Sequence, residues 1–443
     1  MAGKTFFILV LLVSVVSWAQ PEQENVGRTE IMKWQYGKAT ATSITYDGGT
    51  INQFRVALPI MNDLGFPATF FIVTGDITGS KYKGKFIGRP VEEIIRETVT
   101  VPLNEDNFFE RATAVRFLGY EGTPAYHTRA GDFFELGKFG EAYSEIDAAY
   151  MKVRRDEYKP VKEPYDNETV DISWAELKEI AAQAQGHEFA SHSISHPQFA
   201  ICDDVNMKYE LEKSKEELLN QLGPQHTFSH ECPHGSENER VMRYALATYP
   251  ALRNRMPEAF LEELNRWNKM DPGSSAKEYV QWQRGPRTNT SLEQMISWVD
   301  TCLAHDNIWL LLVFHGIDGI GYQPKTGKEI KDYFTYIKSK EDKIWVATFQ
   351  DVTKYIRERM NGRINSSKQG DIIKVELTHT LDPELYDLPL TLKTYVPSEW
   401  RSARVKQGGT IQHVQVRSDG EGHFVLYQAV PNVKPVELLK GDT

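Results

Sequence analysis

Short runs of apolar residues alternate with amphipathic stretches from about residue 38 to residue 361. The short runs are rich in β-branched and aromatic side chains and predict strands, whereas the amphipathic stretches predict helices. The predicted strands are residues 41–46, 68–73, 187–190, 308–314 and 344–349, and the predicted helices are residues 52–63, 174–185, 205–222, 328–338 and 352–360. Because parallel strands need helical crossovers, this alternation predicts an α/β fold, either a barrel or a doubly wound sheet.

Two segments interrupt this alternation. Residues 76–172 are irregular and rich in charged and aromatic side chains, and a connection of this length predicts a subdomain or a lid. Residues 366–443 show a strand-and-turn pattern that predicts a small β-sandwich, with strands at 372–380, 388–395 and 423–429. We therefore expect a barrel over residues 38–361, with residues 76–172 inserted in it, and a C-terminal domain that is either a structural appendage or a carbohydrate-binding module.

The first 19 residues differ from the rest of the chain. Lys4 supplies a positive charge, residues 6–16 are apolar, and Ser17-Trp18-Ala19 offers a small-residue cleavage site. This pattern predicts a secretory signal peptide, because the apolar run is shorter than the roughly 18 residues of a membrane span; an uncleaved anchor is the alternative. We expect an exported chain, periplasmic or secreted, that is not inserted in a membrane after signal cleavage.

Composition and charge narrow the possible partners. The chain is 40% apolar and 25% charged, which is typical of a soluble globular protein. Its 51 basic and 61 acidic side chains give a formal net charge of −10, which disfavours nucleic acid as a partner. The three cysteines permit at most one internal disulfide, and the sequence leaves open whether Cys202 pairs with Cys232.

Candidate chemistry collects after the predicted strands. His192 and His196 are four residues apart, which places two imidazoles on one face of a helical turn and suits a divalent metal. Asp47 ends the first strand before Gly48 and Gly49, where a carboxylate can act as a general base. His315 ends the apolar strand 308–314 and is a candidate general acid. Each residue also has an ordinary structural explanation, but all four follow strands of one predicted sheet.

Together these motifs resemble the polysaccharide deacetylases, the NodB-like carbohydrate esterases. Residues 45–49 are similar to the family's first motif, residues 186–197 to its second, and His315 to its last, so the resemblance covers residues 38–75 and 174–361. It implies a distorted (β/α) barrel with a metal-centred groove. It also implies Asp47 as the base, His315 as the acid, and His192 and His196 as ligands of a divalent metal, with zinc as one candidate.

The chain departs from the family pattern at two positions. Gly48 stands where the family has a second aspartate that binds the metal, so we expect weaker metal binding that still depends on His192 and His196. The loop Glu231-Cys232-Pro233-His234 stands where the family offers an arginine that holds the catalytic aspartate. Loss of this arginine and the proximity of Glu231 should raise the pKa of Asp47.

These departures resemble a non-classical branch of the family, found among enzymes that degrade ulvan-type polysaccharides. The resemblance implies an oligosaccharide dehydratase, in which a base removes a ring proton while an acid protonates a departing hydroxyl. A metal-dependent polysaccharide deacetylase or esterase is the first alternative, and a catalytically silent carbohydrate-binding protein is the second. The expected partner is an oligosaccharide, whereas the sequence does not indicate the oligomeric state.

Substrate contacts are expected from the loops and from the insertion. Glu231 and His234 follow a strand, and Arg284 and Arg287 flank Gly285-Pro286, where a guanidinium can hold a carboxylate or sulfate. We expect residues 76–172 to cover part of the groove and set oligosaccharide specificity. Its aromatic residues form either a sugar-stacking wall or, as we favour for most of them, the insertion's own core: Phe108, Phe109, Tyr120, Tyr126, Phe133 and Phe134.

Overall fold

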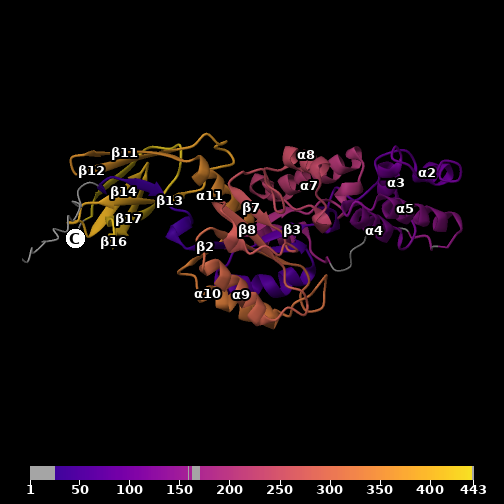
Figure 1. The fold of residues 1–443 in the computed structure, drawn as a ribbon, viewed down its shortest axis with the longest axis horizontal. Coiled ribbons are helices and arrows are strands. Elements are labelled where there is room, and N and C mark those ends of the chain that lie inside the picture. Colours follow the sequence, from indigo (N-terminus) through magenta and orange to yellow (C-terminus); the bar gives the residue numbers. More distant parts are fainter. Residues whose placement is uncertain (1–24, 158, 162–169, 442–443) are drawn as a thin grey trace, which may run out of the picture. The chain divides into compact units, whose positions relative to one another are not determined.

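The computed structural model describes residues 25–157, 159–161 and 170–441 (Figure 1). The chain divides into two compact units, of which the larger comprises Lys33–Asn361 and Leu381–Leu388. The smaller unit contains Gly362–Thr380, the chain from Pro389 onward and an N-terminal segment that ends at Met32. The predicted signal peptide, residues 1–19, lies outside the described residues, so it stays a prediction.

The larger unit is built on a parallel sheet. Its strand order is β6-β5-β4-β3-β2-β9-β8-β7, and β10 also pairs with β2. The strands are β2 Thr40–Gly48, β3 Thr69–Ile72, β4 Glu188–Ser191, β5 Ser229–His230, β6 Ala251–Leu252, β7 Leu261–Leu264, β8 Tyr279–Arg284, β9 Ile308–Phe314 and β10 Ile344–Val346. Among the described residues no pairing joins β6 to β7, so the sheet is a half-barrel. The prediction of an α/β barrel of parallel strands is confirmed in this form.

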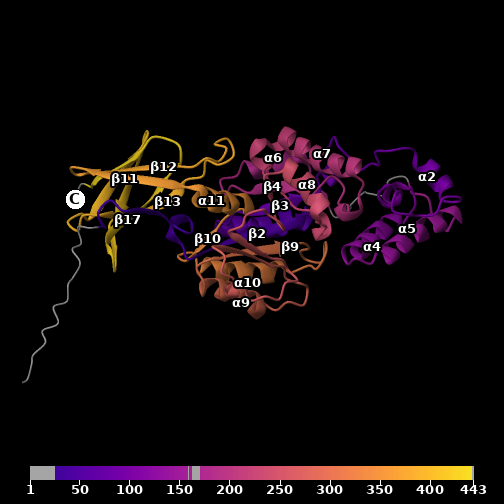
Figure 2. The same ribbon diagram turned by 45° about the horizontal axis from the view of Figure 1, so that its top comes forward.

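Amphipathic helices cover the sheet. They are α1 Leu58–Leu64, α6 Trp174–Ala181, α7 Asp204–Leu222, α8 Glu239–Thr248, α9 Leu292–Leu303, α10 Gly327–Lys338 and α11 Phe349–Asn361. Figures 1 and 2 show α7 and α8 on one side of the strands and α9 and α10 on the other. Every residue of β9 is buried, which explains its unbroken apolar run. Capping boxes at Ser173 and Thr326 fix where α6 and α10 begin.

The insertion is helical, although its sequence pattern did not indicate separate helices. It contains α2 Val91–Glu97, α3 Phe108–Ala114, α4 Thr123–Glu135 and α5 Phe139–Arg154. These helices share a core that includes Phe108 and Tyr126, and Phe109, Tyr120, Phe133 and Phe134 pack against it. The aromatic residues of the insertion are therefore used mainly to hold its own helices together. The pattern was hard to recognise because glycines and loops separate these helices.

The smaller unit consists of two antiparallel sheets. One has the order β1-β13-β17-β16 and the other the order β11-β12-β18-β14-β15. Their strands are β1 Thr29–Ile31, β11 Arg363–Gln369, β12 Ile372–Thr378, β13 Leu390–Val396, β14 Ser402–Gln407, β15 Thr410–Gln415, β16 Arg417–Asp419, β17 Gly422–Ala429 and β18 Val436–Lys440. Strand β1 precedes the parallel sheet in the chain and pairs with β13 here, a contribution that the sequence pattern did not predict.

The structure bears on two expectations, namely a disulfide between Cys202 and Cys232 and the absence of a membrane span. Cys202, Cys232 and Cys302 are free and buried, so Cys202 and Cys232 form no disulfide although both lie in one apolar cluster. Within residues 25–157, 159–161 and 170–441, no helix has the length and apolar character needed to cross a bilayer.

Candidate active site

Functional side chains follow the carboxyl ends of the parallel strands and meet around one cavity. The cavity has a volume of about 910 Å³. Side chains that line it, each at or just after the end of a strand, are Asp47 (β2), His192 (β4), Glu231 (β5), Arg266 (β7) and His315 (β9). This is the edge where ligands bind in sheets of parallel strands, because the connecting loops there converge.

Arg253, at the end of β6, organises the floor of this cavity. Its guanidinium makes a two-point contact with Asp47, of which Nη2 to Oδ2 is 2.8 Å. The same Nη2 lies 2.8 Å from Oε1 of Glu231, which also accepts a 2.7 Å bond from Asn254. The exposed fraction of the side chain is 1% for Arg253 and 2% for Glu231, so three ionisable groups are buried together. One buried cation thus serves two carboxylates.

The sequence-based expectation of a raised pKa for Asp47 is wrong. Burial alone would raise the pKa of Asp47, but the charge and hydrogen bonds of Arg253 outweigh it and hold this pKa well below its usual range. The pKa of Glu231 shifts in the opposite direction. Burial and the charge of Asp47 raise it, although Arg253 acts to lower it. Asp47 is therefore a carboxylate at neutral pH, and Glu231 retains its proton to higher pH than an ordinary glutamate.

His315 lies against the other side of Asp47. Its Nε2 is 3.4 Å from Oδ2 of Asp47. Burial lowers the pKa of His315 to about 4, with Asp47 acting in the opposite direction, so the imidazole is neutral at neutral pH. The buried amide of Gln53 donates to the carbonyls of Asp47 and His315 at 2.7 and 2.9 Å. Gln53 begins a π-helix over Gln53–Ala57, and its amide fixes the ends of β2 and β9 beside each other.

The two predicted metal ligands lie on a turn and not on a helix. Ser193 and His196 both have positive φ angles, 68° and 59°, which interrupt any helical turn. The ring of His196 still lies 4.8 Å from that of His192 and 4.5 Å from that of His234 (centroid distances), all at the cavity. His192 donates from Nδ1 to the Glu231 carbonyl at 3.0 Å. Burial lowers the pKa of His192 to about 4, so this ring is neutral at neutral pH.

These residues do not fit the metal centre that the family resemblance implies. In the part of the chain that the structure describes, no three His, Cys, Asp or Glu side chains converge as ligands of one ion. Gly48 replaces the family's aspartate and has a φ of 91°, a conformation in which an aspartate would be strained. The Asp47 carboxylate is already occupied by Arg253. A divalent cation would therefore find imidazoles but not the aspartate ligand that the family supplies.

Only some of the predicted substrate-binding residues line the cavity. Glu231 and His234 line the cavity, whereas Arg284 and Arg287 are not among its lining residues. Arg284 packs over the Trp282 ring and donates to the backbone of Gln283. Arg287 is exposed, with its guanidinium 4.5 Å from the ring centroid of Trp267. Direct anion binding by Arg284 and Arg287 at the cavity is therefore not supported.

The insertion supplies one wall of the same cavity. Its contribution comes from the segment around η5 (Val115–Phe117) and from α4. The residues concerned are Arg116, Pro124, Ala125, Thr128 and Asp132. Arg116 also donates to the carbonyl of Ser195, in the turn between the two predicted ligands. None of the aromatic side chains proposed for sugar stacking is among these lining residues, in agreement with their packing in the insertion's core.

Sequence reasoning missed the two arginines of the site, Arg253 and Arg266. Arg253 follows a strand of only two residues, and Arg266 follows a four-residue strand with two glutamates, so neither strand carries a strong apolar pattern. The apolar residue pair before Arg253 and the proline before that pair were the only local signals. The contact with Asp47 that the resemblance implies for an arginine of the third motif is made here by Arg253, which follows the next strand, β6.

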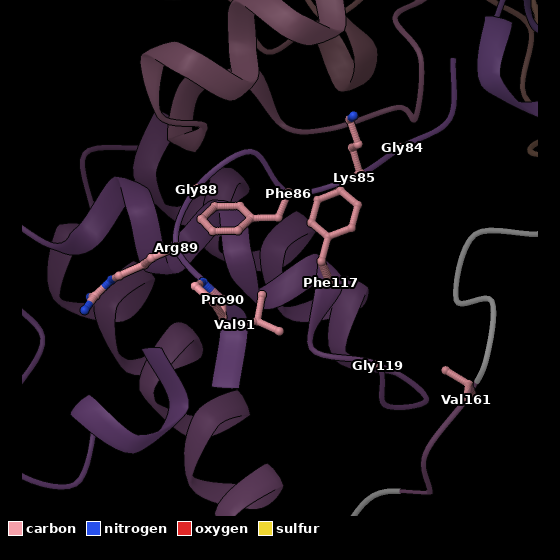
Figure 3. A pocket seen from close by; sticks show the side chains of 10 residues that line it. All are labelled: Gly84, Lys85, Phe86, Gly88, Arg89, Pro90, Val91, Phe117, Gly119 and Val161. Carbon is pink, nitrogen blue, oxygen red and sulfur yellow. The ribbon is translucent and has the colours of Figure 1, made fainter. Parts of the chain in front are cut away.

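A second pocket lies within the insertion and its surroundings (Figure 3). It has a volume of about 460 Å³ and is lined by Gly84, Lys85, Phe86, Gly88, Arg89, Pro90, Val91, Phe117, Gly119 and Val161. Its two cations are engaged elsewhere, because Arg89 pairs with Glu97 and Glu110, and Lys85 lies over the ring of Tyr209. This pocket therefore lacks the chemistry found at the strand ends.

Replacing Arg253 with methionine should destabilise the larger unit by about 3–5 kcal/mol, because two buried carboxylates lose their cation. Arg255→Met is the matched control, since Arg255 pairs with Glu239 at the surface and its loss should cost at most about 1 kcal/mol. Urea unfolding followed by circular dichroism measures both. Equal effects of the two substitutions would contradict a central role for Arg253.

Comparisons with known proteins support the deacetylase resemblance. The family described as polysaccharide deacetylase matches residues 133–252, which include His192, His196, Glu231 and His234. A gellan lyase from Bacillus sp is 25% identical to this chain over 273 residues. That alignment covers 58% of this chain but only 11% of the gellan lyase, so this chain spans a small part of that relative.

The chain is also similar to solved structures at low identity. A peptidoglycan N-acetylglucosamine deacetylase is 11% identical, with a TM-score of 0.33 over 72% of this chain and 89% of that chain. A polysaccharide deacetylase from Mycobacterium smegmatis is 12% identical, with a TM-score of 0.36 over 75% and 94% of the two chains. The polysaccharide deacetylase model thus matches one segment of the larger unit, residues 133–252, which contributes strands β4, β5 and β6 to the parallel half-barrel.

Proposed function

We propose that this chain eliminates water from oligosaccharides of an acidic, ulvan-type polysaccharide. The observation that carries the proposal is the presence of a neutral imidazole, His315, and a buried carboxyl of raised pKa, Glu231, in one cavity. Elimination requires one group that accepts a proton from carbon and one that gives a proton to the leaving oxygen. Two titratable groups whose environments favour opposite protonation states meet this requirement.

His315 is the proposed base. Both predicted catalytic residues have lowered pKa values, and a strongly acidic carboxylate such as Asp47 is a weak proton acceptor. A neutral imidazole accepts a proton more readily, and the imidazolium that forms is stabilised by the Asp47 carboxylate 3.4 Å away. This assignment exchanges the role suggested for His315 by its family resemblance, from acid to base, and makes Asp47 a positioning residue.

Glu231 is the proposed acid. Its Oε1 accepts hydrogen bonds from Asn254 and lies beside Arg253, which leaves Oε2 to carry the proton. Oε2 is buried and has no hydrogen-bond partner among the described residues. A carboxyl with an unused oxygen at a cavity can donate that proton to a substrate hydroxyl.

These two roles account for every bond and proton in the elimination. His315 takes a ring proton from the carbon next to a carboxylate, and the electron pair of the broken C–H bond forms a C=C bond. The C–O bond to the neighbouring hydroxyl breaks, Glu231 protonates that oxygen, and water leaves. A carboxylate beside the reacting carbon favours proton removal when a cation offsets its charge. No oxidant, reductant or other co-reactant is required.

A polysaccharide deacetylase activity is the second candidate. It is supported by the family match over residues 133–252 and by the neighbouring imidazoles of His192, His196 and His234. The name of the gellan lyase relative favours elimination, because a lyase cleaves by elimination, although the alignment covers a small part of that protein. A silent carbohydrate-binding protein would keep the cavity without turnover.

Mass spectrometry of uronate-containing oligosaccharides distinguishes these functions. We expect a product lighter by the mass of one water. Deacetylation of an acetylated substrate would instead lower the mass by one ketene unit, and a silent binding protein would leave the mass unchanged.

His315→Ala and Glu231→Gln should each lower kcat by about 10²–10⁴-fold with the fold intact. His305→Ala, a half-buried histidine that is not among the cavity-lining residues, should leave kcat unchanged. Full turnover by His315→Ala would refute its role as the base.

The pH profile tests the direction of the two proton transfers. Activity should fall as pH decreases through the His315 pKa of about 4, because the protonated imidazole cannot accept a proton. It should also fall as pH increases through the raised pKa of Glu231, because the ionised carboxylate cannot donate. In Glu231→Gln the residual kcat/KM should lose the alkaline decline. An alkaline decline that persists in this variant would show that another group is the acid.

Removal of metal should leave the dehydration unaffected. Gly48 replaces one aspartate of the family's first motif and Asp47 is paired with Arg253, so the chemistry is assigned to Arg253, Glu231 and His315. We expect full activity after dialysis against a chelator, no stoichiometric metal by elemental analysis, and the same result for the His192→Ala, His196→Ala double variant. Activity that is lost on chelation and restored by one equivalent of zinc would favour the deacetylase alternative.

A further inference from the structure

Arg266 is a cation without a protein partner on the wall of the cavity. It follows β7 and lines the cavity with Glu231 and His315. Among the residues that the structure describes, its guanidinium makes no hydrogen bond and no ion pair; Asp47 and Glu231 act on it only at longer range. Charged side chains that are largely withdrawn from water usually find a partner. The missing partner of Arg266 is therefore expected to be a ligand.

Arg253, which lies behind the lining residues Asp47 and Glu231, and Arg116, which lines the cavity, are already engaged. Arg253 is neutralised by Asp47 and shared with Glu231. Arg116 donates to the carbonyl of Ser195. Arg266 is thus the lining guanidinium whose donors are left for a substrate, and five N–H groups in one plane suit a carboxylate.

Gly285 makes room for the stem of Arg266. A Cβ atom at Gly285 would lie 2.9 Å from Cδ of Arg266 and 2.9 Å from the carbonyl oxygen of Val313, closer than real side chains approach. Gly285 follows β8, and Val313 belongs to β9, two residues before His315. The backbone therefore packs closely around the arginine, and its guanidinium is held on the side of the cavity where the proposed base lies.

Two exposed aromatic rings flank the same part of the cavity. Trp267 and Tyr322 both line it, yet their exposed fractions are 65% and 63%. The ring of Tyr322 is 5.4 Å from the ring of His315, and the guanidinium of Arg287 lies 4.5 Å from the ring centroid of Trp267. Large exposed aromatic side chains at a cavity mouth commonly bind a ligand, and their faces suit the apolar C–H face of a pyranose ring.

We propose that Arg266 binds the carboxylate of a uronic acid residue whose ring packs against Trp267 and Tyr322 beside His315. The cation would then offset the carboxylate charge at the carbon from which His315 removes a proton. A sulfate ester is a second anion that a guanidinium can hold, but only a carboxylate lies next to an acidic C–H bond. The inference rests on the proposed function for its chemical purpose, whereas the binding itself can be measured separately.

Binding is tested in the full chain carrying His315→Ala, which preserves the pair of Asp47 and Arg253 while preventing turnover. Calorimetry compares a glucuronate-containing oligosaccharide, the same oligosaccharide with its carboxyl reduced to an alcohol, and a neutral oligosaccharide carrying a sulfate ester. Adding Arg266→Gln should weaken binding of the uronate ligand by about 10- to 100-fold and leave the reduced ligand unchanged. The matched control, Arg284→Gln, should change neither.

A second variant disturbs the packing around the side chain of Arg266 and keeps its positive charge. Gly285→Ala should displace the Arg266 stem and reduce the preference for the uronate over the reduced ligand, provided that thermal unfolding confirms a folded protein. An equal loss for both ligands in Arg266→Gln, or no loss, would overturn the proposal. A selective loss for the sulfated ligand alone would assign the site to sulfate and overturn the carboxylate. Selective uronate binding without water loss by the unmodified enzyme would refute the dehydratase function and leave this site standing.

Discussion

The buried guanidinium of Arg253 is the interaction on which the candidate site depends. It joins the carboxyl ends of three strands, because Asp47 ends β2, Glu231 follows β5 and Arg253 itself follows β6. Asn254, Thr45 and both carboxylates make hydrogen bonds or ion pairs within this buried cluster, whereas Nε of Arg253 and Oε2 of Glu231 have no hydrogen-bond partner among the described residues. The guanidinium also lies 4.9 Å from the ring centroid of Phe71, which forms part of its apolar support.

Arg253 contacts the two carboxyl groups unequally, and their pKa values therefore shift in opposite directions. Asp47 has a two-point contact and remains ionised, whereas Glu231 has a single contact and a buried oxygen without a partner. Two acids a few ångströms apart thus have opposite protonation preferences without any change of residue type. His315 and the other buried imidazoles remain neutral because the cavity withdraws them from water.

The sequence predicted the sheet better than it predicted the site. Strands such as β9 are buried on both faces and have continuous apolar runs, so the α/β pattern was visible without coordinates. Strand ends also located Asp47, His192 and His315, because loops at that edge converge. Arg253 could not be found in this way: its strand has two residues, and its partners are distant in the chain. The direction of the Asp47 pKa was wrong for the same reason, since it depends on that one unrecognised contact.

A guanidinium and a divalent metal supply positive charge to a site in different ways. A metal ion lowers the pKa of a bound water and so generates a nucleophile, which is what hydrolysis of an ester or amide needs. A guanidinium has no coordination site for water; it neutralises anions through fixed N–H groups and stays protonated. With Gly48 at a family ligand position and Asp47 paired to Arg253, positive charge in this cavity comes from arginine side chains. In the elimination proposed above, that kind of charge would stabilise an anionic substrate and the charge that develops on proton removal.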